Sequence, residues 1–167
     1  MTWWYAVVEA RHDLQNPTSP EKIRLLGERL GLGPGSRVLD VASGRGGPAI
    51  LLAGEFGCRI TCVERAPEFV AAARERIEAA ELSALVEVVE ADASERAYEP
   101  GAYDAALCLG AAFVFGGLAE TVAALRPVVR PRGFVVVGEP YLRGSEPVDE
   151  FVPLAETVER FESAGVS

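Results

Sequence analysis

The chain has 167 residues, 49% hydrophobic and 25% charged, so it is long enough for one globular domain with a sizeable core. A formal net charge of −9 repels a phosphate backbone and argues against a nucleic-acid partner. The chain has no run of about eighteen apolar residues and no basic N-terminal leader, so we expect no membrane span or signal peptide and predict a cytoplasmic protein.

Helix-like and strand-like segments alternate along the chain. Two helices come first, at about residues 3–13 and 19–30, and the second has Ser19 as N-cap, Pro20 at its first position and Gly31 as a stop. Strands are expected at 37–41, 59–63, 86–90, 104–109 and 134–138, and helices at 47–56, 67–80, 118–129 and 148–164. This alternation predicts a parallel sheet with helices on both faces and right-handed crossovers.

The three cysteines do not form a disulfide framework. Cys58 and Cys62 bracket an expected strand and lie four residues apart, which separates their Cα atoms by about 13 Å, whereas a disulfide needs less than about 7 Å. Cys108 falls inside another buried strand. We therefore predict three small core residues in a reducing compartment and, without Cys/His spacing, no metal site.

The first strand and the loop after it read V-L-D-V-A-S-G-R-G from Val38 to Gly46. Asp40 lies near the mouth of this buried strand. Gly44 and Gly46 permit a tight turn and a close ligand approach, and a helix follows from Gly47. A strand, a glycine turn and a helix N-terminus form the geometry that binds a nucleotide-like cofactor at the carboxyl edge of a parallel sheet.

The next three strand ends add further candidate ligands. Glu64 closes the second strand, where an acidic residue can accept hydrogen bonds from the two hydroxyls of a ribose. Asp92 follows the third strand and is a candidate acceptor for an exocyclic amine, with Ala93 beside it. Leu109 and Gly110 follow the fourth strand and offer backbone groups and a small wall.

Three residues are candidates for substrate contact or catalysis. Glu139 and Tyr141 follow the fifth strand, at the sheet edge where function concentrates. His12 is the only histidine and lies in the expected N-terminal helix, which would cap the pocket. Each also has an ordinary structural explanation, as a helix-end group for His12 and as packing residues for the other two.

A dinucleotide-binding oxidoreductase is the main alternative, because it too has glycines and an acidic second strand. Its G-x-G-x-x-G loop serves a pyrophosphate at a helix N-terminus. Here Asp40 precedes the first of these glycines by four residues, and a carboxylate suits an ammonium or a sulfonium better than a pyrophosphate. Together with Glu64 and Asp92 it indicates a cofactor that carries positive charge.

The ordered segments V-L-D-V-A-S-G-R-G, V-E-R, E-A-D-A and Y-D-A-A-L-C-L-G resemble the motifs of class I S-adenosylmethionine (SAM) dependent methyltransferases, over about Ser36 to Glu139. H-D-L-Q-N-P-T-S-P-E-K, G-A-A-F-V-F-G-G and G-E-P-Y-L-R are similar to a branch of small bacterial methyltransferases. The resemblance implies an α/β fold, a Rossmann-like three-layer α/β/α sandwich with a mostly parallel sheet of order 3-2-1-4-5. It implies SAM-binding residues Asp40, Ala42, Ser43, Gly44, Gly46, Glu64, Arg65, Asp92, Ala93, Leu109 and Gly110.

One departure concerns Ala42, which occupies the position of the family's usual first glycine. Another is that the chain stops where a sixth and an antiparallel seventh strand normally follow. We thus predict a single SAM-binding domain over 1–167 with a helical cap at 1–35 and without strands six and seven, and we consider a homodimer because a sheet edge is left open.

The function that follows is methyl transfer from SAM to a small-molecule acceptor by in-line SN2 displacement. No N-P-P-Y element follows the fourth strand, where Leu109 to Ala112 read L-G-A-A, which argues against methylation of nucleic-acid base amines. A SAM-binding module without turnover is the alternative, and an NAD(P)-dependent oxidoreductase is the less favoured one.

Overall fold

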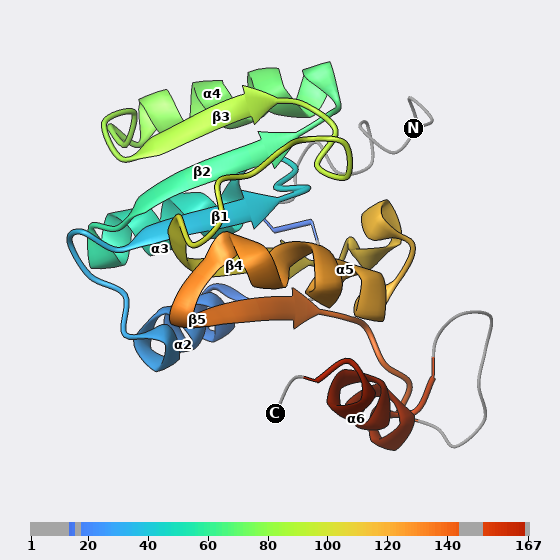
Figure 1. The fold of residues 1–167 in the computed structure, drawn as a ribbon. Coiled ribbons are helices and arrows are strands. Elements are labelled where there is room, and N and C mark those ends of the chain that lie inside the picture. The colour runs from blue at the N-terminus through green and yellow to red at the C-terminus, as the bar shows by residue number, and fades with distance from the viewer. Residues whose placement is uncertain (1–13, 16–17, 144–151, 166–167) are drawn as a thin grey trace.

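The computed structural model describes residues 14–15, 18–143 and 152–165, which build one five-stranded sheet of order β3-β2-β1-β4-β5. All four neighbouring pairs are parallel, so the carboxyl ends of the strands meet along one edge, to the right in Figure 1. This order confirms the predicted α/β fold.

The strands are β1 (Arg37–Val41), β2 (Arg59–Glu64), β3 (Val86–Glu90), β4 (Tyr103–Leu109) and β5 (Val129–Gly138). The α-helices are α2 (Pro20–Leu30), α3 (Gly47–Phe56), α4 (Pro67–Ala79), α5 (Leu118–Leu125) and α6 (Leu154–Ser163). Two short 3₁₀ helices are η1 (Ala112–Phe115) and η2 (Arg126–Val128).

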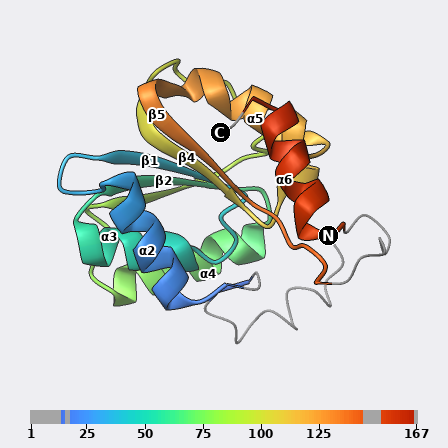
Figure 2. The same cartoon turned by 90° about the horizontal axis from the view of Figure 1, so that it is seen from below.

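The helices form two layers, with α2, α3 and α4 on one face of the sheet and α5 and α6 on the other (Figure 2). Strand β1 is central and buried on both faces, which explains why Val38, Leu39 and Val41 are all apolar rather than alternating with polar residues. Val38 packs in the cluster beneath α2 and α3, whereas Leu39 packs in the cluster beneath α5. Alternate side chains of one strand therefore supply both cores.

Local signals account for most element ends. The Ser19 hydroxyl accepts a hydrogen bond from the Lys22 N–H at 3.4 Å, and Gly31 ends α2 in the left-handed conformation, φ 62°. Gly27 of α2 has no room for a Cβ, which would lie 2.2 Å from the Phe56 ring. Because Phe56 is the last residue of α3, helices α2 and α3 approach closely on this face of the sheet.

The connection from α5 to β5 differs from the expected helix at 118–129. Helix α5 ends at Leu125 because Pro127 has no N–H to continue the ladder, and the chain tightens into η2. Strand β5 begins at Val129, opposite Tyr103, rather than at Phe134. The residues between Val129 and Phe134 form a bulge, in which a Cβ on Gly133 would lie 2.8 Å from the Asp104 carbonyl oxygen.

The last helix begins later than the expected residue 148. Residues 144–151 lie outside the described part, but Val152 and Pro153 are not helical. The Val152 carbonyl accepts a hydrogen bond from the Leu142 N–H at 2.9 Å, and α6 starts at Leu154. No strand follows β5 within residues 139–143 and 152–165. The expected helix at 3–13 falls outside the described residues.

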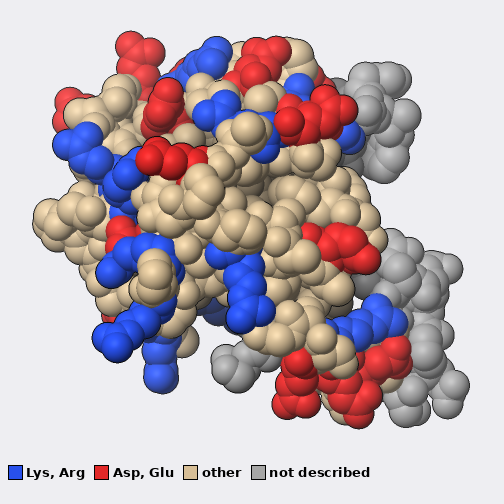
Figure 3. Space-filling model, viewed as in Figure 1, with Lys and Arg blue, Asp and Glu red and all other residues tan. Residues whose placement is uncertain are grey.

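The described surface carries charges of both signs. On the face in Figure 3, acidic side chains gather over α6, and basic side chains are spread between acidic ones elsewhere. Within 14–15, 18–143 and 152–165, no helix has both the length and the apolar character of a membrane span.

Candidate functional site

The loop between β1 and α3 has a strained backbone that only small residues adopt easily. Ala42, Gly44 and Gly46 all have positive φ, at 52°, 56° and 72°. The left-handed region costs a residue with a Cβ about 1–2 kcal/mol. Ala42 therefore holds a conformation that glycine adopts without strain, which accounts for the family's glycine at this position. This turn connects β1 to the N-terminus of α3, which begins at Gly47.

A cavity lies where this loop meets the carboxyl ends of β1, β2 and β4, and we refer to it as the first cavity. Its empty volume is about 850 Å³, a value that includes space open to solvent. Its lining residues are Gln15, Asp40, Ala42, Ser43, Gly44, Gly47, Pro48, Val63, Glu64, Arg65, Phe69, Ala91, Ala93, Leu109, Gly110, Ala111, Phe113 and Val114.

Asp40 is the most unusual group in the first cavity. It is 2% exposed, and its Oδ2 atom has no hydrogen-bond partner. Burial first, and then the nearby carboxylate of Glu64, raise the pKa of Asp40 from 3.8 to about 7. A buried acceptor that lacks a donor is costly unless a ligand supplies one. A cationic N–H donor in the first cavity would satisfy this atom and stabilise its ionised form.

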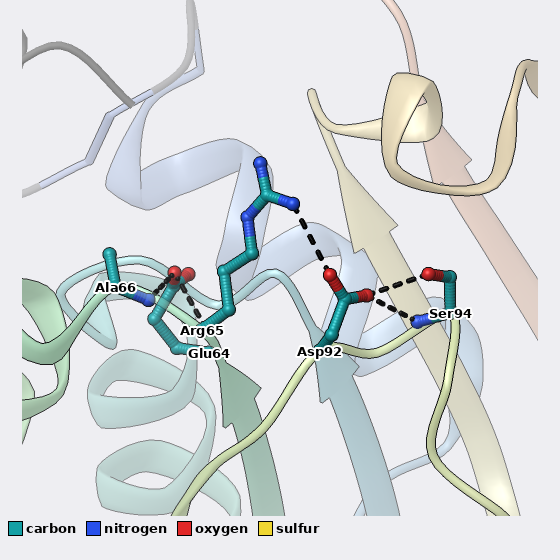
Figure 4. Close-up of polar contacts among 5 residues, drawn as sticks. All are labelled: Glu64, Arg65, Ala66, Asp92 and Ser94. Atoms are coloured by element: carbon teal, nitrogen blue, oxygen red, sulfur yellow. Dashed lines mark hydrogen bonds and ion pairs between the residues drawn. The ribbon is translucent and has the colours of Figure 1, made fainter.

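Glu64 is 4% exposed, and backbone N–H groups hold its carboxylate in place. Its Oε2 accepts from the Gly44 N–H at 2.9 Å. Its Oε1 accepts from the N–H groups of Arg65 and Ala66, both at 2.9 Å (Figure 4). A carboxylate has about four acceptor positions, so one remains for a ligand hydroxyl. The sequence led us to expect that Glu64 accepts hydrogen bonds from both hydroxyls of a ribose. To do so, its carboxylate would have to lose one of the three hydrogen bonds from backbone N–H groups.

Asp92 lies beside the first cavity but is not one of its lining residues. Its Oδ1 accepts from the Ser94 N–H at 2.9 Å and from the Ser94 hydroxyl at 2.7 Å, and its Oδ2 is 3.2 Å from Nη1 of Arg65 (Figure 4). These donors, the Ser94 side chain first, lower the pKa of Asp92. Ala91 and Ala93 on either side do line the cavity. Asp92 is thus placed to orient Arg65 and the turn at Ser94.

Several lining residues were not among the candidates from the sequence. Gln15 lies over the glycine loop, and its Oε1 accepts a hydrogen bond from the Arg45 N–H at 2.7 Å. A Cβ on Gly44 would lie 2.0 Å from the same oxygen. Phe113 lines the cavity while 69% exposed. In the sequence, the only indication that Phe113 contacts a ligand was its position in the apolar run of G-A-A-F-V-F-G-G, before two glycines. For Gln15 the only indication was its place in the motif H-D-L-Q-N-P-T-S-P-E-K.

Gly46 and Tyr141 are two further predicted residues that do not line the first cavity. Gly46 does not line the first cavity; it is the N-cap of α3, and its N–H donates to the Ser43 carbonyl at 3.0 Å. Tyr141 is 46% exposed and lines neither this cavity nor the next one described. His12 lies outside the described residues.

A second cavity adjoins the first at Leu109 and Gly110, which line both. It opens between α2 and the ends of β4 and β5, and its empty volume is about 580 Å³ including space open to solvent. Its lining residues are Thr18, Lys22, Ile23, Leu26, Leu109, Gly110, Gly138, Glu139 and Pro140. Glu139 thus reaches a cavity, as a residue at a strand end was expected to do.

Glu139 resembles Asp40 in having a buried oxygen, Oε1, without a partner. Burial raises the pKa of Glu139, and the backbone N–H of Ala112 opposes this shift in part. The three cysteines are buried and free, as expected. The described residues contain no group of three or more His, Cys, Asp or Glu side chains arranged to hold a metal ion.

Comparison with known proteins places this chain in a family. The family model described as "Methyltransferase domain" matches residues 38–133. An uncharacterised protein of Escherichia coli K12, YjhP, is 32% identical over 139 residues, which cover 83% of this chain and 56% of that protein. The chain thus spans just over half the length of this relative.

Two solved structures have the same fold over nearly the whole chain. A SAM-dependent methyltransferase from Geobacter sulfurreducens, in complex with S-adenosyl-L-homocysteine, has 31% identity and a TM-score of 0.90. One from Thiobacillus denitrificans, also in complex with S-adenosyl-L-homocysteine, has 29% identity and a TM-score of 0.90. Each alignment covers 99% of this chain and 71% of the other.

Proposed function

The chain belongs to the methyltransferase domain family, and on that premise we propose that it transfers a methyl group from SAM to a small-molecule acceptor by in-line displacement. The observation that carries this proposal is the partnerless Oδ2 of Asp40 in the wall of the first cavity. SAM carries an ammonium group, whose N–H donors would satisfy this oxygen. The carboxylates of Asp40 and Glu64 make the cavity suitable for a cation.

We assign lining residues to the parts of SAM. Asp40 would receive the ammonium, and the free acceptor position of Glu64 would receive a ribose hydroxyl. Ala93 and the backbone around Leu109 would border the base and the methionyl end. Arg65 lines the cavity and is held by Asp92, so its guanidinium would lie at the edge of the base.

When bound, SAM supplies a methyl group that its sulfonium has already activated. The protein has to hold donor and acceptor in line and exclude water. The two cavities adjoin at Leu109 and Gly110, so an acceptor in the second cavity would have to reach the methyl group beside these two residues. Phe113 and Val114 supply apolar surface on the first cavity. No covalent step by a side chain is required.

Binding of SAM and of S-adenosylhomocysteine, measured by isothermal titration calorimetry, tests the cofactor. We expect Glu64→Gln to weaken S-adenosylhomocysteine binding at least about tenfold, because the amide removes an acceptor from a set of N–H donors. Glu90→Gln is the matched control, since Glu90 is the exposed partner of Glu64 in the β2–β3 register. Equal affinities for the two variants would count against the proposal.

Turnover is tested by S-adenosylhomocysteine release with a panel of small acceptors. Binding of SAM without turnover on any acceptor would favour a SAM-binding module. Binding of NAD without binding of SAM would favour an oxidoreductase and refute the proposal.

A further inference from the structure

We propose that the second cavity is the acceptor site, and that the acceptor is a small molecule with an anionic group held by Lys22 and an N–H or O–H group held by Glu139. This inference rests on the proposed function and specifies its substrate class. It starts from the shared wall of the two cavities, since Leu109 and Gly110 line both. A ligand in the second cavity is therefore the neighbour of a donor in the first.

Glu139 defines one end of the acceptor. Its Oε1 is buried and has no partner, although the residue lines a cavity. A buried carboxylate oxygen needs a donor, and an acceptor amine or hydroxyl supplies one. The acceptor atom would form its new bond to carbon as the carbon–sulfur bond breaks with its electron pair left on sulfur. The proton of the acceptor would pass to Glu139 Oε1, so charge and atoms balance.

Lys22 is the second charged residue of the cavity wall. It is the only lysine of the chain, and it lines the second cavity from the first turn of α2. A cation is unfavourable at this position because the N-terminus of a helix is itself positive. No ion pair within the described residues compensates it. Both positive features would favour an anionic group such as a carboxylate or a phosphate.

The rest of the cavity wall is mainly apolar. Ile23 and Leu26 contribute from α2, Leu109 from β4 and Pro140 from the end of β5. Such a wall accepts a short hydrocarbon segment but offers few further hydrogen bonds. The acceptor class is therefore a compact acid with a nucleophilic N–H or O–H group.

The single lysine makes a direct binding test possible. Protein labelled with ¹³C at lysine Cε, saturated with S-adenosylhomocysteine, gives one lysine side-chain signal. It is titrated with a panel of small amino acids, hydroxy acids and phosphomonoesters, each paired with its uncharged amide or parent alcohol. We expect the acids of at least one pair to shift the signal saturably and the uncharged partners to leave it in place. A signal that no acid moves, or that both partners move equally, would overturn the proposal.

Variants then connect binding to turnover. For an acid that binds, Lys22→Met should raise KM at least about tenfold, and Lys22→Arg should restore most of the loss. Arg24→Met is the matched control, because it removes a charge from the same helix where Arg24 pairs with Glu55. Glu139→Gln should lower kcat, because the amide cannot accept the proton of the acceptor. The pH dependence of kcat that we expect for the wild type should be absent in this variant. An unchanged KM in Lys22→Met would refute the acid-binding role.

S-adenosylhomocysteine affinity is measured for every variant by calorimetry. It should stay within about twofold of wild type in Lys22→Met, since Lys22 does not line the first cavity. Normal cofactor affinity with no effect of Lys22 on the acceptor would defeat this inference alone. Absence of cofactor binding in the wild type would instead defeat the proposed function.

Discussion

Replacing Asp40 by asparagine should stabilise the fold in a way that depends on pH. In the folded protein the pKa of Asp40 is raised to about 7 by burial and by Glu64, whereas an unfolded aspartate keeps a value near 3.8. Between these two values the unfolded chain has lost its proton and the folded protein retains it. Wild-type stability therefore falls as pH rises through this window and levels off above about pH 7. The amide of the Asp40→Asn variant does not ionise, so the variant escapes this loss.

The magnitude follows from the width of the window. The interval from pH 5 to the folded pKa of Asp40 is about two pH units, and each unit changes the free energy of unfolding by about 1.4 kcal/mol. The stability of the variant relative to wild type should therefore grow by up to about 3 kcal/mol between pH 5 and pH 8. Any constant effect of the amide, such as an unpaired N–H, cancels in this difference.

The assay is urea unfolding of Asp40→Asn and wild type at pH 5 and pH 8 without cofactor. Asp92→Asn is the control, because Ser94 and Arg65 lower the pKa of Asp92 below its unfolded value of 3.8. Its carboxylate therefore stabilises the fold at both pH 5 and pH 8, and this variant should lose about the same stability at the two pH values. An Asp40→Asn difference that is the same at both pH values would refute the reasoning. The same variant should also bind SAM more weakly, because its amide carries no charge.

Three further outcomes are expected. Ala42→Gly should change the free energy of unfolding by less than about 1 kcal/mol, because relief of the left-handed strain is offset by the greater freedom of glycine in the unfolded chain. The midpoints of urea unfolding measure this change. A larger loss of stability would show that the Ala42 methyl packs favourably. The thiols of Cys58, Cys62 and Cys108 are buried with raised pKa values, so a thiol reagent at pH 8 should label them only after denaturation, and labelling of the native protein would contradict their burial. Leu125→Ala should cost about 2–5 kcal/mol, since Leu125 is fully buried, and a smaller shift of the urea midpoint would mean that the core beneath α5 relaxes.

The sequence by itself determined the order and type of the elements. Their signals are local: a capping serine before a proline at Ser19 and Pro20, a glycine stop at Gly31, and short segments rich in apolar residues between turns. Such signals depend on neighbours in the chain, and β1, β3, α2 and α3 have the predicted ends. The glycine loop after β1 also belongs to this group, because positive φ limits the residues that can occupy it.

Only the tertiary structure decided how the polar groups pair. The carboxylate of Asp92 is bound by Ser94 and Arg65, and that of Glu64 accepts hydrogen bonds from three backbone N–H groups. Each carboxylate therefore has fewer acceptor positions left for a ligand than its place in the sequence indicated. Hydrogen bonds of this kind depend on distances of tenths of an ångström, which no sequence pattern encodes. The bulge before Phe134 is likewise set by the fit of β5 against β4.

The second cavity is the clearest case of what the sequence does not contain. Lys22 and Glu139 are 117 positions apart in the chain, and they line one space only because α2 packs beside the end of β5. The partnerless oxygens of Asp40 and Glu139 have the same origin, since burial is a property of the packed molecule. Residue types thus determine which elements form, whereas packing determines which of their side chains share a cavity and which lose contact with water.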